Sequence, residues 1–217
     1  MARAAGLVQL ELDAGHKILV VGQNGSGKSV LVTWIARSFD RVVVYDPKDD
    51  PAAELPGAAV VRTAREAVRH LPGKVLYRPS GAELARIPER FDEVCRKVLE
   101  DARAGRGATA IVIHELGDLG SPWRVGPALS EAVRKGRSLG ITIAAATQRP
   151  QGIPVLFRTE AQHVACFTLI DPADRDLMAG VMGSRLVASE PLPLDFTWWY
   201  RGPDLRFQLC RPISLSR

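Results

Sequence analysis

Cysteine is scarce in this chain. Only three of its 217 residues are cysteines, namely Cys95, Cys166 and Cys210, and they are scattered along the sequence. An odd number without metal-ligand spacing fits neither a disulfide framework nor a metal site. We therefore expect reduced, buried thiols in a cytoplasmic protein.

Long apolar runs are also missing. No stretch approaches the ~18–20 apolar residues of a membrane helix. The N-terminus alternates in polarity and carries acids early, unlike a signal peptide. Repeats, low-complexity segments and linkers are absent as well. We expect a soluble protein with one domain over 1–217, consisting of a core over about 16–183 and a β appendage over about 184–217.

Lysine contributes little of the positive charge. The net charge is +5, and only 6 of the 29 basic residues are lysines, the rest being arginines. Arginine makes bidentate contacts to phosphate, but a high arginine content equally reflects genomic base composition. The charge alone is therefore weak evidence for a nucleic-acid partner.

Apolar segments alternate with amphipathic ones along the chain. The pattern predicts strands at 7–12, 16–22, 41–46, 59–63, 74–80, 109–115, 141–148 and 163–170. Helices are predicted at 28–39, 64–71, 88–104, 126–139, 154–160 and 172–182, with two more strands around a turn within 196–210. Continuous apolar strands between helices predict a mainly parallel sheet covered on both faces. Residues 51–57 and 190–193 are expected to form surface loops.

A glycine-rich motif, "GQNGSGKS", occupies Gly22–Ser29. It fits G-x-x-x-x-G-K-[ST] between a predicted strand and a predicted helix, where backbone N–H groups and the helix N-terminus bind phosphate. Lys28 can reach the β- and γ-phosphates, and the Ser29 hydroxyl can ligate Mg²⁺. The expected nucleotide-binding residues are Gly22, Gln23, Asn24, Gly25, Ser26, Gly27, Lys28, Ser29 and Val30.

The stretch "AIVIHE" supplies a candidate for hydrolysis. Glu115 follows an apolar strand and would orient or deprotonate the attacking water. The residue before it, expected to be an aspartate holding Mg²⁺ through water, is His114. A neutral imidazole can accept a hydrogen bond from a Mg²⁺-bound water but brings no negative charge. Asp46, ending the strand beside the phosphate loop, and Asp118 are candidate substitutes.

A third polar position ends the strand "ITIAAATQ". Gln148 there can bond both the γ-phosphate and the water and so report the nucleotide state. Several basic residues could in turn reach a neighbouring subunit's γ-phosphate as an arginine finger. The residues themselves do not choose among Arg134, Lys135, Arg137, Arg149 and Arg158.

Together these stretches resemble the FtsK/HerA superfamily of P-loop motors. "VVVYDPKDD" (42–50), "RKGRSLGITIAAATQRP" (134–150) and "HVACFTLIDPADRDLMAGVMG" (163–183) carry the resemblance, with the second the most specific. The likeness implies a RecA-like (ASCE) P-loop α/β fold, with a C-terminal β-hairpin in this chain. It matches Lys28, Glu115, Gln148 and Arg137 to catalytic positions, Arg137 acting across subunits. His114 departs from the family's aspartate.

The short chain is most similar to the genome-packaging ATPases of tectivirus-like double-stranded DNA viruses with an internal membrane. The resemblance implies an ATP- and Mg²⁺-dependent translocase in a ring, as a hexamer, that moves double-stranded DNA without reading its sequence. It also implies a capsid-vertex or membrane portal partner and a place in the host cytoplasm or at the virion vertex. Candidate DNA-contact segments are 117–126, with Arg124 and an exposed Trp123, and 77–86.

Other functions stay open at this point. One is a cellular or mobile-element translocase of the HerA or conjugative coupling type. Another is a phage morphogenesis protein of the zonula-occludens-toxin-like type, which normally carries a membrane segment. A small-molecule kinase would leave "TQRP" unexplained. The aromatic run Trp198–Tyr200 is expected to pack against the sheet edge.

Overall fold

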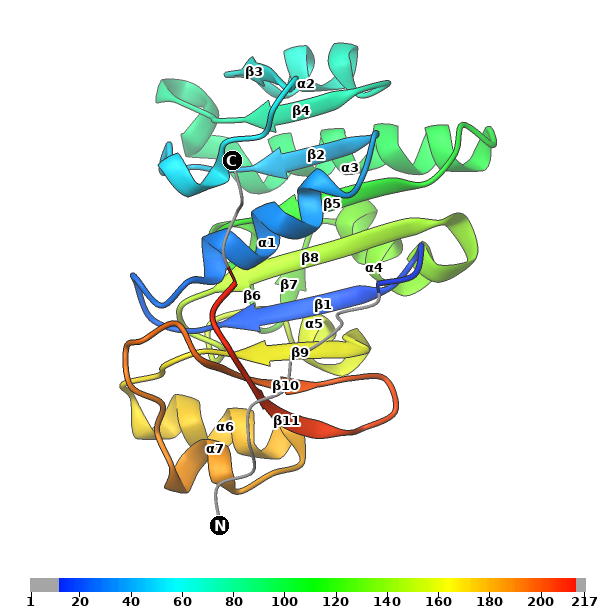
Figure 1. Cartoon of the computed structure of the whole chain (residues 1–217). Helices are drawn as coiled ribbons and strands as arrows, with labels where there is room; N and C mark the ends of the chain where they lie inside the picture. The colour runs from blue at the N-terminus through cyan, green and yellow to red at the C-terminus, as the bar shows by residue number, and fades with distance from the viewer. Residues whose placement is uncertain (1–11, 214–217) are drawn as a thin grey trace.

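The computed structural model describes residues 12–213. Within them, nine strands form one sheet in the order β11-β10-β9-β1-β8-β5-β2-β4-β3 (Figure 1). The strands are β1 (Lys17–Val21), β2 (Val42–Tyr45), β3 (Ala59–Val61), β4 (Lys74–Tyr77), β5 (Thr109–Ile113), β8 (Ile141–Thr147), β9 (His163–Cys166), β10 (Trp198–Arg201) and β11 (Phe207–Cys210). Every neighbouring pair from β9 to β3 is parallel. The predicted mainly parallel α/β fold is confirmed.

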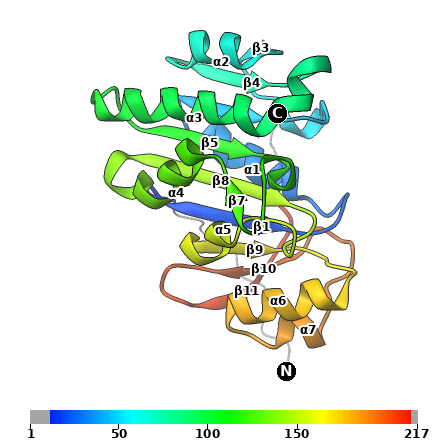
Figure 2. The same cartoon turned by 180° about the vertical axis from the view of Figure 1, so that it is seen from behind.

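Helices cover both faces of this sheet. They are α1 (Lys28–Arg37), α2 (Ala64–His70), α3 (Ile87–Arg103), α4 (Pro127–Leu139), α5 (Val155–Glu160), α6 (Pro172–Met182) and α7 (Leu186–Ser189). Helix α1 lies on one face (Figure 1), and α3, α4 and α5 lie on the other (Figure 2). Because successive strand residues point to opposite faces, Ile18 and Val20 of β1 join the apolar cluster under α1, whereas Leu19 and Val21 join the other.

The strand order determines which loops meet. Strand β8 lies between β1 and β5, so the segments after β1, β8 and β5 gather at the carboxyl edge of the sheet, where ligands bind in open α/β folds. The strand that ends before Asp46 is β2, and both β8 and β5 separate it from β1. Our placement of Asp46 on the strand beside the phosphate loop was therefore wrong.

The C-terminal hairpin continues the main sheet. Strand β10 pairs antiparallel with β9, and β11 pairs antiparallel with β10. Trp198 and Tyr200 pack into the cluster on the α1 side, whereas Trp199 packs into the opposite cluster and stacks on Phe207. The prediction that these aromatics pack against the sheet edge is confirmed.

Several short elements were not predicted. They are the 3₁₀ turns Pro51–Ala53, Gly81–Arg86 and Leu116–Leu119, the hairpin of β6 (Gly120–Ser121) with β7 (Arg124–Val125), and helix α7. Segments of two to six residues carry too little periodicity to be recognised. The segment 51–57, predicted as a surface loop, also buries Ala53 and Leu55 in the core. The strand predicted over 7–12 lies almost wholly outside the described residues.

The three cysteines are buried and unpaired, as expected. A search of residues 12–213 finds no helix with the length and apolar character needed to cross a bilayer.

Candidate functional site

The predicted phosphate loop joins β1 to α1. Its first backbone amides are tied to neighbouring strands, because Gly22 N donates to the Thr147 carbonyl at 3.2 Å and Gln23 N donates to the Thr168 carbonyl at 2.8 Å. A Cβ atom on Gly22 would lie 2.6 Å from Cβ of Phe167. Only glycine therefore fits at this close approach of two backbones.

The helix behind the loop begins without a side-chain cap. Gly27 is the N-cap of α1, with a φ of 104°, and no side chain accepts a hydrogen bond from the first turn. The open N–H groups and the helix dipole favour an anion there. The Lys28 amine donates to the Gln23 carbonyl at 2.8 Å, across the loop. Burial lowers the pKa of Lys28 to about 8, although the charge of Glu115 opposes this shift.

A cavity of about 320 Å³ opens over this loop. Residues 24–30 line it together with Asp50, Ala52 and Phe196. Phe196 is 51% exposed and has a φ of 67°, which is rare for a bulky residue and marks a constrained position. Sequence reasoning missed Asp50 and Phe196. The stretch 42–50 gave Asp50 no role of its own, and Phe196 reaches the cavity from a loop that matches no motif.

Glu115 and Gln148 meet at the sheet edge. Gln148 Nε2 donates to Glu115 Oε2 at 2.9 Å, and the Lys48 amine donates to the same oxygen at 2.7 Å. Both bonds end on Oε2, so Oε1 stays available to a water proton. Lys48 belongs to the "DPK" stretch noted in the sequence, but its pairing with Glu115 was not predicted.

His114 is enclosed beside this group. It is 8% exposed, and neither ring nitrogen has a hydrogen-bond partner among the described residues. Burial lowers the pKa of His114 to about 4, although Asp46 and Asp50 favour the charged form. The imidazole is therefore neutral at pH 7, the form that can accept a hydrogen bond.

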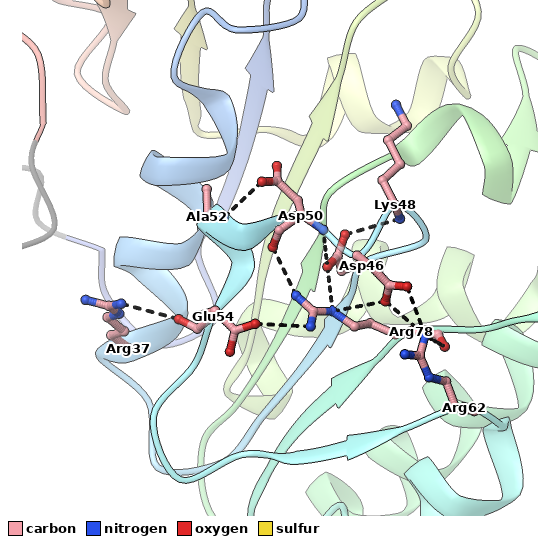
Figure 3. Close-up of polar contacts among 9 residues, drawn as sticks. Arg37, Asp46, Lys48, Asp50, Ala52, Glu54, Arg62 and Arg78 are labelled. Carbon is pink, nitrogen blue, oxygen red and sulfur yellow. Dashed lines mark hydrogen bonds and ion pairs between the residues drawn. The ribbon is translucent and has the colours of Figure 1, made fainter.

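A charged cluster holds the loop that follows β2 (Figure 3). The fully buried Asp46 accepts hydrogen bonds from Arg78 Nε at 2.9 Å, Asp50 N at 2.9 Å and Lys48 N at 3.3 Å. Arg78 also donates to the Asp50 carbonyl at 3.0 Å and to Glu54 Oε1 at 3.1 Å. A single arginine thus links both ends of the loop to the sheet.

Neither aspartate proposed as a substitute acid lines the cavity. The Asp46 carboxylate is occupied by Arg78 and two backbone amides. Asp118 accepts a hydrogen bond from the Tyr45 hydroxyl at 3.2 Å. Burial and the charge of Glu115 raise the pKa of Asp118.

The candidate arginine fingers differ in their partners. Arg149 forms ion pairs at 2.9 Å with Asp171 and with Asp174, and Arg158 donates to the Pro150 carbonyl. Arg137 is exposed, and within residues 12–213 its side chain has neither an ion pair nor a hydrogen bond. It lies at the end of α4 and packs against Gly15, at the amino edge of the sheet. This edge is opposite to the carboxyl edge that carries the phosphate loop.

The two candidate DNA-contact segments also differ. In 77–86, Tyr77 is buried and Arg78 is held in the charged cluster, whereas Arg86 is exposed. Arg78 is therefore not available to phosphate, and contact of this segment with DNA stays a prediction. In 117–126, Trp123 is 89% exposed at the tip of the β6–β7 hairpin, and Arg124 is exposed beside it. This hairpin borders a cavity of about 470 Å³.

No protein-family model matches the chain. Protein P9 of Pseudoalteromonas phage PM2 is 29% identical over 138 residues, which are 62% of this chain. The chain spans 60% of the length of that relative.

Similar solved structures match a larger share of the chain than this relative does. The genome packaging NTPase B204 from Sulfolobus turreted icosahedral virus 2, in complex with ATP-gammaS, has a TM-score of 0.74 and 15% identity, covering 94% of this chain and 100% of that one. The pCW3 conjugation coupling protein TcpA, with ATPgS, has a TM-score of 0.62 and 16% identity, over 94% of this chain and 62% of that one. The resemblance inferred from the motifs is confirmed in these neighbours: the chain has the fold of P-loop NTPases and is similar to a viral genome-packaging NTPase.

Proposed function

We propose that this protein is an ATP-driven double-stranded DNA translocase that packages a viral genome into a preformed capsid. The observation that carries the proposal beyond nucleotide binding is the pairing of Glu115 with Gln148. Gln148 follows β8, the strand beside β1, and Glu115 follows β5, the next strand in the sheet. A carboxylate beside a γ-phosphate sensor is the arrangement that hydrolysis requires. Similarity to a packaging NTPase and to a phage protein supports the viral setting.

In this proposal each loop at the carboxyl edge has one task. The N–H groups of residues 24–29 bind the phosphates, and Lys28 leaves the Gln23 carbonyl to contact them. Glu115 takes the proton of the attacking water through Oε1, and Gln148 keeps the carboxylate in place.

Magnesium fits the residues present, because hydroxyl and carboxylate oxygens are the ligands it prefers. Ser29 and Asp50 both line the cavity over the phosphate loop. When bound, the ion would neutralise charge on the phosphate oxygens.

Subunits would assemble as a ring, with Arg137 of one subunit reaching the nucleotide of the next. The exposed position of Arg137 at the amino edge of the sheet supports a role across an interface. The β6–β7 hairpin, with Trp123 and Arg124, would contact duplex phosphates in the ring.

ATPase activity with and without duplex DNA tests the proposal. Lys28→Ala and Glu115→Gln are expected to abolish turnover, and Arg137→Ala to abolish it while leaving ATP binding intact. Stimulation by duplex DNA should fade as salt rises, since phosphate contacts are salt-dependent. Absence of ATP hydrolysis by the wild-type protein, with or without DNA, would refute the function.

A conjugative or cellular translocase is the second candidate, favoured by the similarity to the coupling protein TcpA. Genomic neighbourhood separates the two, because capsid genes should flank a packaging motor, whereas relaxase or nuclease genes should flank a coupling protein.

A further inference from the structure

The acid that would support magnesium is missing from its expected place. His114 stands where the sequence pattern requires an aspartate, and it brings no negative charge. Its two ring nitrogens are unpartnered among the described residues, and the side chain is more than nine-tenths buried. The charges that act on it include those of Asp46, Asp50 and Lys28.

Most of the acidic side chains around His114 already have hydrogen-bond or ion-pair partners. Asp46 binds Arg78 and two backbone amides and has no exposed surface. Glu115 binds Lys48 and Gln148. Asp118 binds the Tyr45 hydroxyl outside the cavity.

Asp50 differs from these acids in both position and access. It is the acid that lines the phosphate-loop cavity, within the part of the chain that the structure describes. One carboxylate oxygen accepts a hydrogen bond from Ala52 N at 2.9 Å, and Ser29 lines the same cavity. Asp50 and the first magnesium ligand expected from the motif therefore border the same cavity.

The backbone of Asp50 is fixed by hydrogen bonds to the charged cluster. Its N–H donates to Asp46, and its carbonyl accepts from Arg78, while its carboxylate points away from that guanidinium (Figure 3). Because the buried Asp46–Arg78 pair fixes the loop, little entropy is lost when the carboxylate engages a ligand.

We propose that the Asp50 carboxylate, together with the Ser29 hydroxyl, binds the magnesium ion that accompanies the nucleotide, in place of an acid at position 114. The inference rests on the proposed nucleotide site and assigns its metal ligand. Among residues 12–213, no group of three or more His, Cys, Asp or Glu side chains could hold a metal ion. Magnesium typically binds through one or two carboxylates plus substrate phosphates and water, so it would bind with the nucleotide.

Asp50→Asn separates the metal role from a structural one. Asparagine is as good an N-cap as aspartate, so the 3₁₀ turn that Asp50 begins should persist. The matched control is Asp49→Asn, which removes an exposed carboxylate of the same loop. Asp49 pairs with Arg62 at 2.9 Å and with Arg78 at 3.4 Å.

The measurements are binding of a fluorescent ATP analogue in EDTA and in a magnesium titration, and Mn²⁺ binding by electron paramagnetic resonance with nucleotide present. For Asp50→Asn we expect unchanged affinity in EDTA and a loss of about 10- to 100-fold in apparent Mg²⁺ and Mn²⁺ affinity, the range seen when metal-site residues are removed. Asp49→Asn should match wild type.

Wild-type metal affinity in Asp50→Asn would overturn the proposal while leaving the proposed function intact. Failure of the wild-type protein to bind nucleotide under either condition would refute the proposed function itself, and the metal assignment with it.

Discussion

Glu115 is held by two side chains that share one of its oxygens. Lys48 and Gln148 both donate to Oε2, so the carboxylate has a set orientation and Oε1 faces any water alone. These two hydrogen bonds orient the Glu115 carboxylate and leave Oε1 for the attacking water. Lys48 and Gln148 therefore act as positioning residues for the proposed hydrolysis.

We expect Lys48→Met and Gln148→Ala each to lower kcat about tenfold, well short of the loss of 10² to 10⁴ expected for Glu115→Gln, which removes the general base. Nucleotide affinity should stay unchanged in all three. Steady-state kinetics with parallel binding measurements check this. A rise in KM with constant kcat would show instead that these side chains contact the substrate.

Phe196 is the second residue for which the structure gives a testable prediction. Its half-exposed ring lies near Gly27 at the wall of the cavity, and its positive φ costs free energy that a function would justify. An aromatic ring beside a phosphate-binding site can stack on the base of a bound nucleotide.

We expect Phe196→Ala to weaken ATP binding by about 1–3 kcal/mol, the range for base–aromatic stacking. Binding of inorganic tripolyphosphate should not change, because it has no base, and Phe196→Trp should retain ATP affinity. Calorimetry of both ligands separates the two contributions. Equal losses for ATP and tripolyphosphate would place the effect in the phosphate loop.

At the scale of elements, the edge of the sheet depends on a buried histidine. His163 of β9 contacts the Tyr200 hydroxyl of β10 at 2.6 Å and His16 Nδ1 at 2.9 Å. Burial, with the nearby His16 and Arg201 charges, lowers the pKa of His163 from 6.5 to about 4. The C-terminal hairpin is therefore joined to the parallel sheet through a neutral imidazole.

This pKa predicts the pH dependence of stability. Between pH 6.5 and 4 the unfolded chain binds a proton at this residue that the folded chain does not, so stability is greatest above pH 6.5 and falls as pH drops to 4. We expect His163 to account for on the order of 2 kcal/mol of this loss.

Urea unfolding from pH 7.5 to 4.5 measures the effect. His163→Gln should have a shallower pH dependence than wild type, and the exposed His70→Gln should match wild type. The slope should not vanish, because His114 shifts in the same direction. An unchanged slope in His163→Gln would contradict the assignment.

For the whole molecule, Arg137 and Lys28 lie on opposite edges of one sheet. Helix α4 ends at Gly140, whose φ of 66° turns the chain directly into β8, and β8 then runs its full length to reach the edge with Gln148. One subunit cannot bring Arg137 to its own phosphates. If Arg137 acts in hydrolysis, it acts between copies, through a head-to-tail interface that a ring supplies.

Mixing inactive variants tests this geometry. Lys28→Ala and Arg137→Ala should each lack activity, but a mixture should recover part of it, because some interfaces combine an intact loop from one variant with an intact arginine from the other. Activity of mixed and unmixed samples, with assembly followed by light scattering, is the measurement. Assembled mixtures that stay inactive would argue against an intersubunit role.

The amino-acid sequence by itself determined the alternation of strands and helices and the position of the phosphate loop, because these depend on local periodicity and on short-range glycine and lysine spacing. It also placed Glu115 and Gln148 at strand ends, and the parallel sheet brought those ends together. The roles assigned to the site residues stay predictions, namely those of Lys28, Ser29, His114, Glu115, Arg137 and Gln148.

Only the tertiary structure decided which side chains meet across distant segments. Asp46 was expected next to the phosphate loop, but the strand order places it elsewhere. There its carboxylate accepts a hydrogen bond from Arg78, 32 residues away in the chain. Asp50, Lys48 and Phe196 reached the site because loops at the carboxyl edge converge there. Strand order and loop packing are long-range properties, set by burial of the whole sheet, and no local pattern in the sequence encodes them.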